Sequence, residues 1–187
     1  MDQFEYLSVL ISLILGLGIT QILTGFGRWL EQRASFKAYG PAIGWAAFLL
    51  IVHVQTWWSM FGLRHWPDWN FLQFGLVLLQ PSILFLMAIL AFPGPNSADD
   101  LRANYFVQRR WFFGMLMALL VVSILKDLIR SGDLPDALNL LFHGVFFSIA
   151  TIAFATESER AHRRLAVAAL GSIVVYILVL FATLGSL

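Results

Sequence analysis

Cysteine is absent from this 187-residue chain, and charged residues are scarce at 12%. Without cysteine the chain forms no disulfide, offers no thiolate nucleophile and cannot hold zinc or an iron–sulfur cluster through sulfur. The net charge of +1 is small, and the basic residues lie in short clusters between apolar runs, which argues against a nucleic-acid partner. The remaining chemistry rests on histidine, amide, hydroxyl and a few charged groups.

Enzyme motifs are missing as well. The sequence has no His-Glu-x-x-His metalloprotease motif, no phosphate-binding glycine loop with lysine and no Gly-x-Ser-x-Gly nucleophile elbow. These absences disfavour a membrane-embedded hydrolase. Whether the protein is an enzyme stays open at this stage, with the balance against it, and no catalytic residue is predicted.

Apolar residues make up 59% of the chain, more than a soluble domain of this size has interior to bury. A transmembrane helix needs about 20 consecutive apolar residues. The sequence therefore predicts an all-α, polytopic transmembrane bundle in contact with the lipid bilayer, forming a single domain over residues 1–187. Its six spans are expected at 6–27, 41–63, 71–92, 111–130, 137–156 and 165–186.

The basic residues predict how the chain is threaded. Nine of the twelve lysines and arginines fall in the first, third and fifth connections between the spans: Arg28, Arg33 and Lys37; Arg102, Arg109 and Arg110; Arg160, Arg163 and Arg164. Short loops rich in Lys and Arg are retained in the cytoplasm during insertion. We therefore expect both termini on the non-cytoplasmic side.

Two capping motifs refine the helix starts. Ser97 to Asp100 has the Ser-x-x-Asp form, which predicts that helix four begins near Ala98, in the membrane interface. Thr156 to Glu159 repeats the form and predicts a very tight link between helices five and six. Those two helices should be antiparallel neighbours.

Small residues form two stripes on the first helix. Gly16, Thr20 and Thr24 lie on one stripe, and Gly18 and Gly25 lie on the next, together with Gln21. Such spacing lets two helix backbones approach closely, so we predict helix packing there, with a homo-oligomer interface as one use. The alternative is a flexible helix beside a substrate site.

The opening Phe4-Glu5-Tyr6-Leu7-Ser8 and the Gly-Leu-Gly-Ile-Thr-Gln element at residues 16–21 resemble a group of uncharacterised small bacterial membrane proteins. The resemblance covers the first helix. It implies a bacterial inner membrane location and no particular activity.

Larger polar residues inside the predicted spans gather toward the middle and the outer half of the bilayer. This bias favours a permease, channel or carrier whose site would be lined by His53, Gln80, Lys126, Asp127 and His143. Gln80 precedes Pro81, which frees the carbonyl of residue 77 and predicts a kink.

Lys126 and Asp127 have two interpretations. Near the outer end of helix four, Lys126 can snorkel to the interface while Asp127 pairs with Arg130, three residues on. The alternative is an inward-facing pair that lines an outer vestibule.

His53 and His143 suggest a different class of protein. At overlapping depths they could ligate one haem, or bind a quinone, if helices two and five were neighbours. Structural histidines bonded to a neighbouring helix are the simpler interpretation, and any metal role depends on the haem. A third hypothesis is a non-catalytic partner or sensor subunit of a larger membrane complex, whose polar residues only bind helices together.

Overall fold

The computed structural model describes residues 3–32, 37–65, 69–94 and 100–180. This part of the chain is helical and has no β-strand, and its elements are α1 (Gln3–Glu31), α2 (Gly40–Ser59), the 3-10 helix η1 (Met60–His65), α3 (Phe71–Ala91), α4 (Leu101–Ser131), α5 (Ala137–Ala155) and α6 (Glu159–Leu180). Six of the helices are long and apolar enough to cross a membrane. The predicted all-α bundle of six spans is confirmed.

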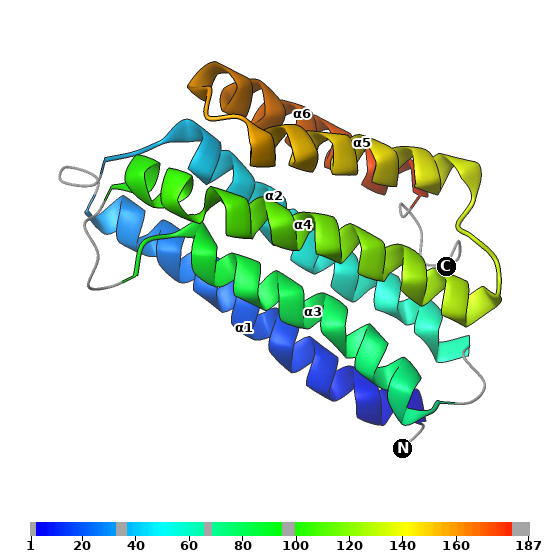
Figure 1. Cartoon of the computed structure of the whole chain (residues 1–187). Helices are drawn as coiled ribbons and strands as arrows, with labels where there is room; N and C mark the ends of the chain where they lie inside the picture. Colours follow the sequence, from blue (N-terminus) through cyan, green and yellow to red (C-terminus); the bar gives the residue numbers. More distant parts are fainter. Residues whose placement is uncertain (1–2, 33–36, 66–68, 95–99, 181–187) are drawn as a thin grey trace.

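The helices run roughly along one direction in three layers (Figure 1). α1 lies beside α3 on one side, α5 beside α6 on the other, and α2 and α4 lie between the two pairs. α5 and α6 are antiparallel neighbours, joined by residues 156–158, as the tight capping motif predicted.

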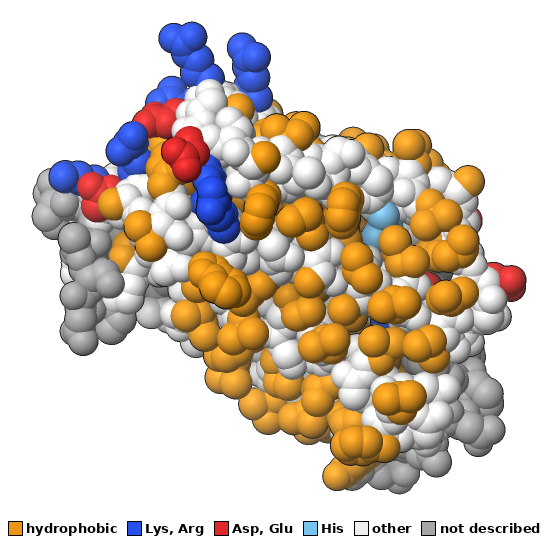
Figure 2. Space-filling model, in the orientation of Figure 1, with side chains coloured by type: hydrophobic (Ala, Val, Ile, Leu, Met, Phe, Trp, Pro, Cys, Tyr) orange, Lys and Arg blue, Asp and Glu red, His pale blue; other side chains and the backbone are white. Residues whose placement is uncertain are grey.

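The two ends of the bundle differ in charge. α1, α3 and α5 end, and α2, α4 and α6 begin, at the same end of the bundle. Figure 2 shows Lys and Arg side chains gathered there, whereas apolar side chains cover the body of the bundle. We call this the basic end. The α2–α3 and α4–α5 connections lie at the opposite end.

Side-chain caps define where several helices begin. The side chain of Asn70 accepts the Gln73 N–H at 2.9 Å, and Gln73 Oε1 accepts the Asn70 N–H at 3.1 Å, which completes a capping box before α3. Asp136 Oδ1 accepts two backbone N–H groups at the start of α5, both at 2.9 Å. α4 ends at Gly132, whose φ of 76° is the left-handed conformation that glycine tolerates.

Two predicted spans begin too late. α4 begins at Leu101, near the start at Ala98 that the capping motif predicted, although its span was expected from 111. α6 begins at Glu159 rather than 165, so all six basic residues assigned to those two connections lie on helices. A span predicted from consecutive apolar residues stops at the first charged residue. The helix itself continues into the membrane interface when its charged residues lie on one face. Residues 97–99 of the first capping motif and 181–186 of the predicted sixth span lie outside the described residues.

Asp100 joins two connections at the basic end. It caps α4 by accepting the Ala103 N–H at 2.9 Å, and its carboxylate lies 3.5 Å from the Lys37 ammonium. The Lys37 carbonyl in turn accepts a hydrogen bond from the Leu101 N–H at 3.1 Å. The pKa of the Asp100 carboxyl is lowered, chiefly by the hydrogen bond from the Ala103 N–H and to a smaller extent by the charge of Lys37. The pKa of nearby Tyr39 is raised, chiefly by burial against Tyr105.

The two small-residue stripes of α1 have different environments. Gly18 and Gly25 face the bundle: a Cβ on Gly18 would lie 2.3 Å from His53 Nε2, and one on Gly25 would lie 2.2 Å from the Phe92 ring. Gly16 has open space around it, and Thr20 and Thr24 are exposed. The inner stripe therefore packs α1 onto α2 and α3, whereas the outer stripe faces away from the chain.

We predict that Gly25→Ala destabilises the protein by about 1–3 kcal/mol because the added methyl must displace the buried Phe92 ring. Gly16→Ala is the matched control on the same helix. It should be neutral or stabilising by up to about 1 kcal/mol, since alanine favours helix and meets nothing there. Thermal unfolding in detergent, followed by circular dichroism, measures both. Equal midpoints for the two variants would contradict this packing.

Candidate functional site

A polar cavity of about 270 Å³ lies at the end of the bundle opposite the basic end. Its walls come from α2, η1, α3, α4, α5 and α6, and α1 contributes none of its lining residues. We call this cavity the vestibule. The polar and charged side chains in its walls are Gln55, Ser59, Gln80, Ser123, Lys126, Asp127, Arg130, Asp136, Asn139 and Tyr176.

Three of the predicted site residues meet in the vestibule: Gln80, Lys126 and Asp127. Lys126 Nζ donates to Gln80 Oε1 at 3.2 Å. At 1.5 Å per residue, Gln80 lies about 14 Å along α3 from its start, whereas Lys126 lies about 8 Å from the end of α4. The ammonium therefore points toward the middle of the bundle. This contact supports the inward-facing interpretation of Lys126, not snorkelling to the interface.

The acidic side chains of the vestibule already have partners. Asp127 Oδ1 lies 4.0 Å from Arg130 Nε, which is the local pair that the sequence predicted. Asp136 is engaged by the two backbone N–H groups that it caps. Lys126 differs, because within the described part of the chain its ammonium has a neutral amide as its hydrogen-bonding partner.

A smaller cavity of about 60 Å³ adjoins the vestibule, and we call it the chamber. Both cavities are lined by Gln55, Gln80, Ser123 and Tyr176, but most of the chamber wall is apolar, with Phe48, Val52, Leu116, Leu119, Phe146 and Ile173.

Two polar groups face this apolar wall. His143 lines the chamber, and its Nδ1 lies 2.9 Å from the Asn139 carbonyl. A carbonyl only accepts, so Nδ1 carries the proton and Nε2 is left as an acceptor. Thr56 lines the chamber too, and its buried hydroxyl has no hydrogen-bond partner among the described residues. Both groups are available to a bound molecule.

His53 lies elsewhere. It is fully buried on α2, packs against Gly18 of α1, and its Nδ1 donates to the Leu49 carbonyl at 2.7 Å. It lines neither the vestibule nor the chamber. A bis-histidine haem requires two imidazoles facing one pocket. The structure does not bring His53 and His143 together in that way.

A cluster of aromatic rings packs against the side of the chamber that faces the basic end. Trp45 is 2% exposed, and its ring centroid lies 5.2 Å from Phe48, 4.9 Å from Phe113 and 5.9 Å from Phe112. Phe48 also lines the chamber. We call these four residues the aromatic plug. On their far side, Trp45 and Phe112 line a cavity of only about 10 Å³ together with Arg109.

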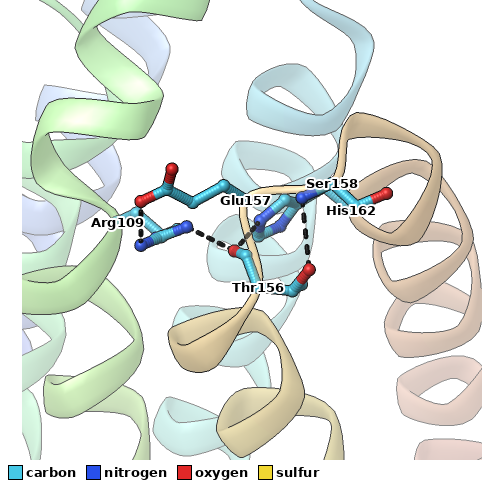
Figure 3. A network of polar contacts seen from close by, with 5 residues as sticks. All are labelled: Arg109, Thr156, Glu157, Ser158 and His162. Atoms are coloured by element: carbon cyan, nitrogen blue, oxygen red, sulfur yellow. Dashed lines mark hydrogen bonds and ion pairs between the residues drawn. The ribbon is translucent and has the colours of Figure 1, made fainter.

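A polar network built on two buried side chains, Arg109 and His162, lies on the basic side of the plug, and Figure 3 shows its central part. Arg109 of α4 is 3% exposed and donates to the Thr156 carbonyl and, at 3.0 Å, to Glu157. His162 of α6 donates from Nε2 to the same carbonyl at 3.0 Å, so its Nδ1 accepts the Tyr105 hydroxyl at 2.7 Å. The network joins α4 to the α5–α6 link.

Sequence reasoning placed Arg109 and His162 in connections and so missed this network. A signal was present: Leu101, Tyr105, Arg109 and Phe112 recur at intervals of three and four residues, which puts Arg109 on an otherwise apolar helical face. All four side chains are buried in the structure.

No protein-family model, curated protein or solved structure matches this chain.

We predict that Arg109→Gln destabilises the protein by about 1–3 kcal/mol, because a shorter neutral side chain loses charge-assisted hydrogen bonds to the α5–α6 link. Arg110→Gln is the matched control: its side chain is exposed, and a change within about 0.5 kcal/mol is expected. Thermal unfolding in detergent again measures both. If the two variants unfold at the same temperature, the network does not hold α4 to the link.

Proposed function

We propose that this multi-pass membrane protein is a small carrier of the permease type, which binds a small polar solute in the vestibule. The observation that carries the proposal is a polar cavity at one end of the bundle, whose adjoining chamber has Phe48 of the aromatic plug in its wall. A cavity that reaches a binding site from one face and stops is what alternating access requires of one of its states.

The dimensions favour a carrier of small solutes over a channel. At about 30 Å³ of liquid volume per water molecule, the vestibule of about 270 Å³ holds about nine waters. An open channel needs a continuous path, whereas the rings of Trp45, Phe112 and Phe113 pack against one another and the cavity beside them has only about 10 Å³. Transport would require these rings, and the Arg109 network behind them, to separate.

We further propose that the basic end faces the cytoplasm of a bacterial inner membrane and that the vestibule opens to the outside. The clustering of Lys and Arg at one end supports this orientation.

A second candidate function is that of a sensor or partner subunit, which would bind a solute without moving it. The packed rings of the aromatic plug favour this candidate, because a sensor needs no path for a solute through the bundle. A homo-oligomer through the exposed stripe of Gly16, Thr20 and Thr24 is compatible with either function. Haem or quinone binding between His53 and His143 gains no support, since His53 packs against Gly18.

The absence of cysteine provides a direct test. A single Ser123→Cys replacement puts one thiol at the boundary of the vestibule and the chamber. We predict that a membrane-impermeant thiol reagent labels it from both faces of the membrane, in right-side-out and in inverted vesicles, because a carrier exposes its site alternately. Labelling from the outer face only would contradict transport and favour the sensor.

Two further single-cysteine variants control this experiment. Ser148→Cys replaces an exposed residue in the middle of α5 and should resist an aqueous reagent from either face. Ser158→Cys lies in the α5–α6 link and should react from the cytoplasmic face alone. Reaction of Ser158→Cys from the outside would overturn the proposed orientation.

A further inference from the structure

We propose that the solute is a short-chain organic carboxylate, whose carboxylate group binds Lys126 and whose apolar tail enters the chamber. This inference rests on the proposed function, in that it names the class of molecule that the same vestibule binds. It depends on three features of the site: the charge of Lys126, the hydrogen-bonding groups around it and the apolar chamber beside it.

The charge is the first step. Asp127 is paired with Arg130, and Asp136 caps α5, so both carboxylates that line the vestibule have partners. The ammonium of Lys126 has three N–H donors, and its partner among the described residues is the neutral Gln80 amide. Lys126 is half-buried, and the Asp127 carboxylate beside it acts on it through space but makes no hydrogen bond to it among the described contacts. An anion in the vestibule would therefore supply a hydrogen-bonding partner of opposite charge. The vestibule is therefore built to accept a negative charge at Lys126.

Neighbouring groups make the site suitable for a carboxylate. Ser123 lies one turn before Lys126 on α4 and lines both cavities, so its hydroxyl is on the same face of the helix. Gln55 lines both cavities from α2. A carboxylate offers about four acceptor positions, which one ammonium, a hydroxyl and an amide can share.

The chamber determines the rest of the molecule. It adjoins the vestibule next to Ser123 and Gln80, and its wall is mostly apolar. Its volume of about 60 Å³ is about that of two water molecules, which suits a tail of two or three carbons. A bare inorganic anion would leave the chamber unused, and a long acyl chain would collide with Phe48 of the plug.

Protection of a thiol from labelling tests the proposal on the full chain in detergent. Ser59→Cys puts a probe in the vestibule wall without changing Lys126 or the chamber. We predict that sodium butyrate slows its reaction with a maleimide, and that the half-protecting concentration falls about fourfold per methylene from acetate to butyrate. Butyramide and sodium chloride, at the same concentration and ionic strength, should not protect.

Variants in the Ser59→Cys background assign the effect to one side chain. Lys126→Gln should abolish protection by butyrate, whereas Lys126→Arg, which keeps the charge, should retain it. Arg64→Gln removes a positive charge at the same end of the chain's bundle but outside the vestibule lining, and should leave protection unchanged. Gel filtration and circular dichroism check that each variant is folded. Protection by the series from acetate to butyrate is measured on the Ser59→Cys protein that retains Lys126.

Equal protection by chloride or butyramide, no gain with chain length, or protection that survives Lys126→Gln would overturn the carboxylate site. These failures are distinct from failure of the proposed function. If Ser123→Cys is labelled from both faces but no carboxylate protects Ser59→Cys, the carrier stands and its solute is of another class. If butyrate protects but Ser123→Cys reacts from one face only, the carboxylate site belongs to a sensor.

Discussion

Hydrocarbon offers no hydrogen bonds, so polar groups in the spans find their partners within the protein or in its cavities. Most hydroxyl groups do so locally. Thr20, Ser82 and Ser148 each donate to the carbonyl four residues earlier in their own helix, at 2.8 Å. Two long charged side chains find their partners on other elements: Lys126 donates to Gln80 of α3, and Arg109 donates to Glu157 of the α5–α6 link. The vestibule and the basic-end network are two places in the described part of the chain where long polar side chains meet partners on other helices.

The same face of α4 connects these two places. Arg109, Phe113, Leu116, Ser123 and Lys126 follow one another at three- and four-residue steps or their sums, and they contribute in turn to the network, the plug, the chamber and the vestibule. A rotation or tilt of α4 would alter all four layers together. Because the α5–α6 link holds the basic end of α4 through Arg109, that link is where such a movement would be restrained.

Periodicity and charge were sufficient to predict six apolar helices and the gathering of basic residues at one end, whereas a functional site at the other end stays a prediction. Gln80, Lys126 and Asp127 were predicted together and are found in one cavity. His53 was assigned to the same site but faces Gly18, because hydropathy gives a residue's depth and not the rotation of its helix. Arg109 and His162 were assigned to connections, since the charge of an arginine is read as exposure unless its partners are known. Partners far apart in sequence, such as Arg109 and Thr156, are set by tertiary packing.

The peripheral position of α1 bears on whether one chain suffices to make the site. Six short helices enclose little volume, so a sizeable pore would need several copies of the chain. In the structure, α1 packs through Gly18 and Gly25 onto α2 and α3 from outside, and the other five helices surround the vestibule. A solute of a few heavy atoms needs no more space than this. The cavity is therefore formed within a single chain, and any association through the outer stripe of α1 would leave its walls unchanged.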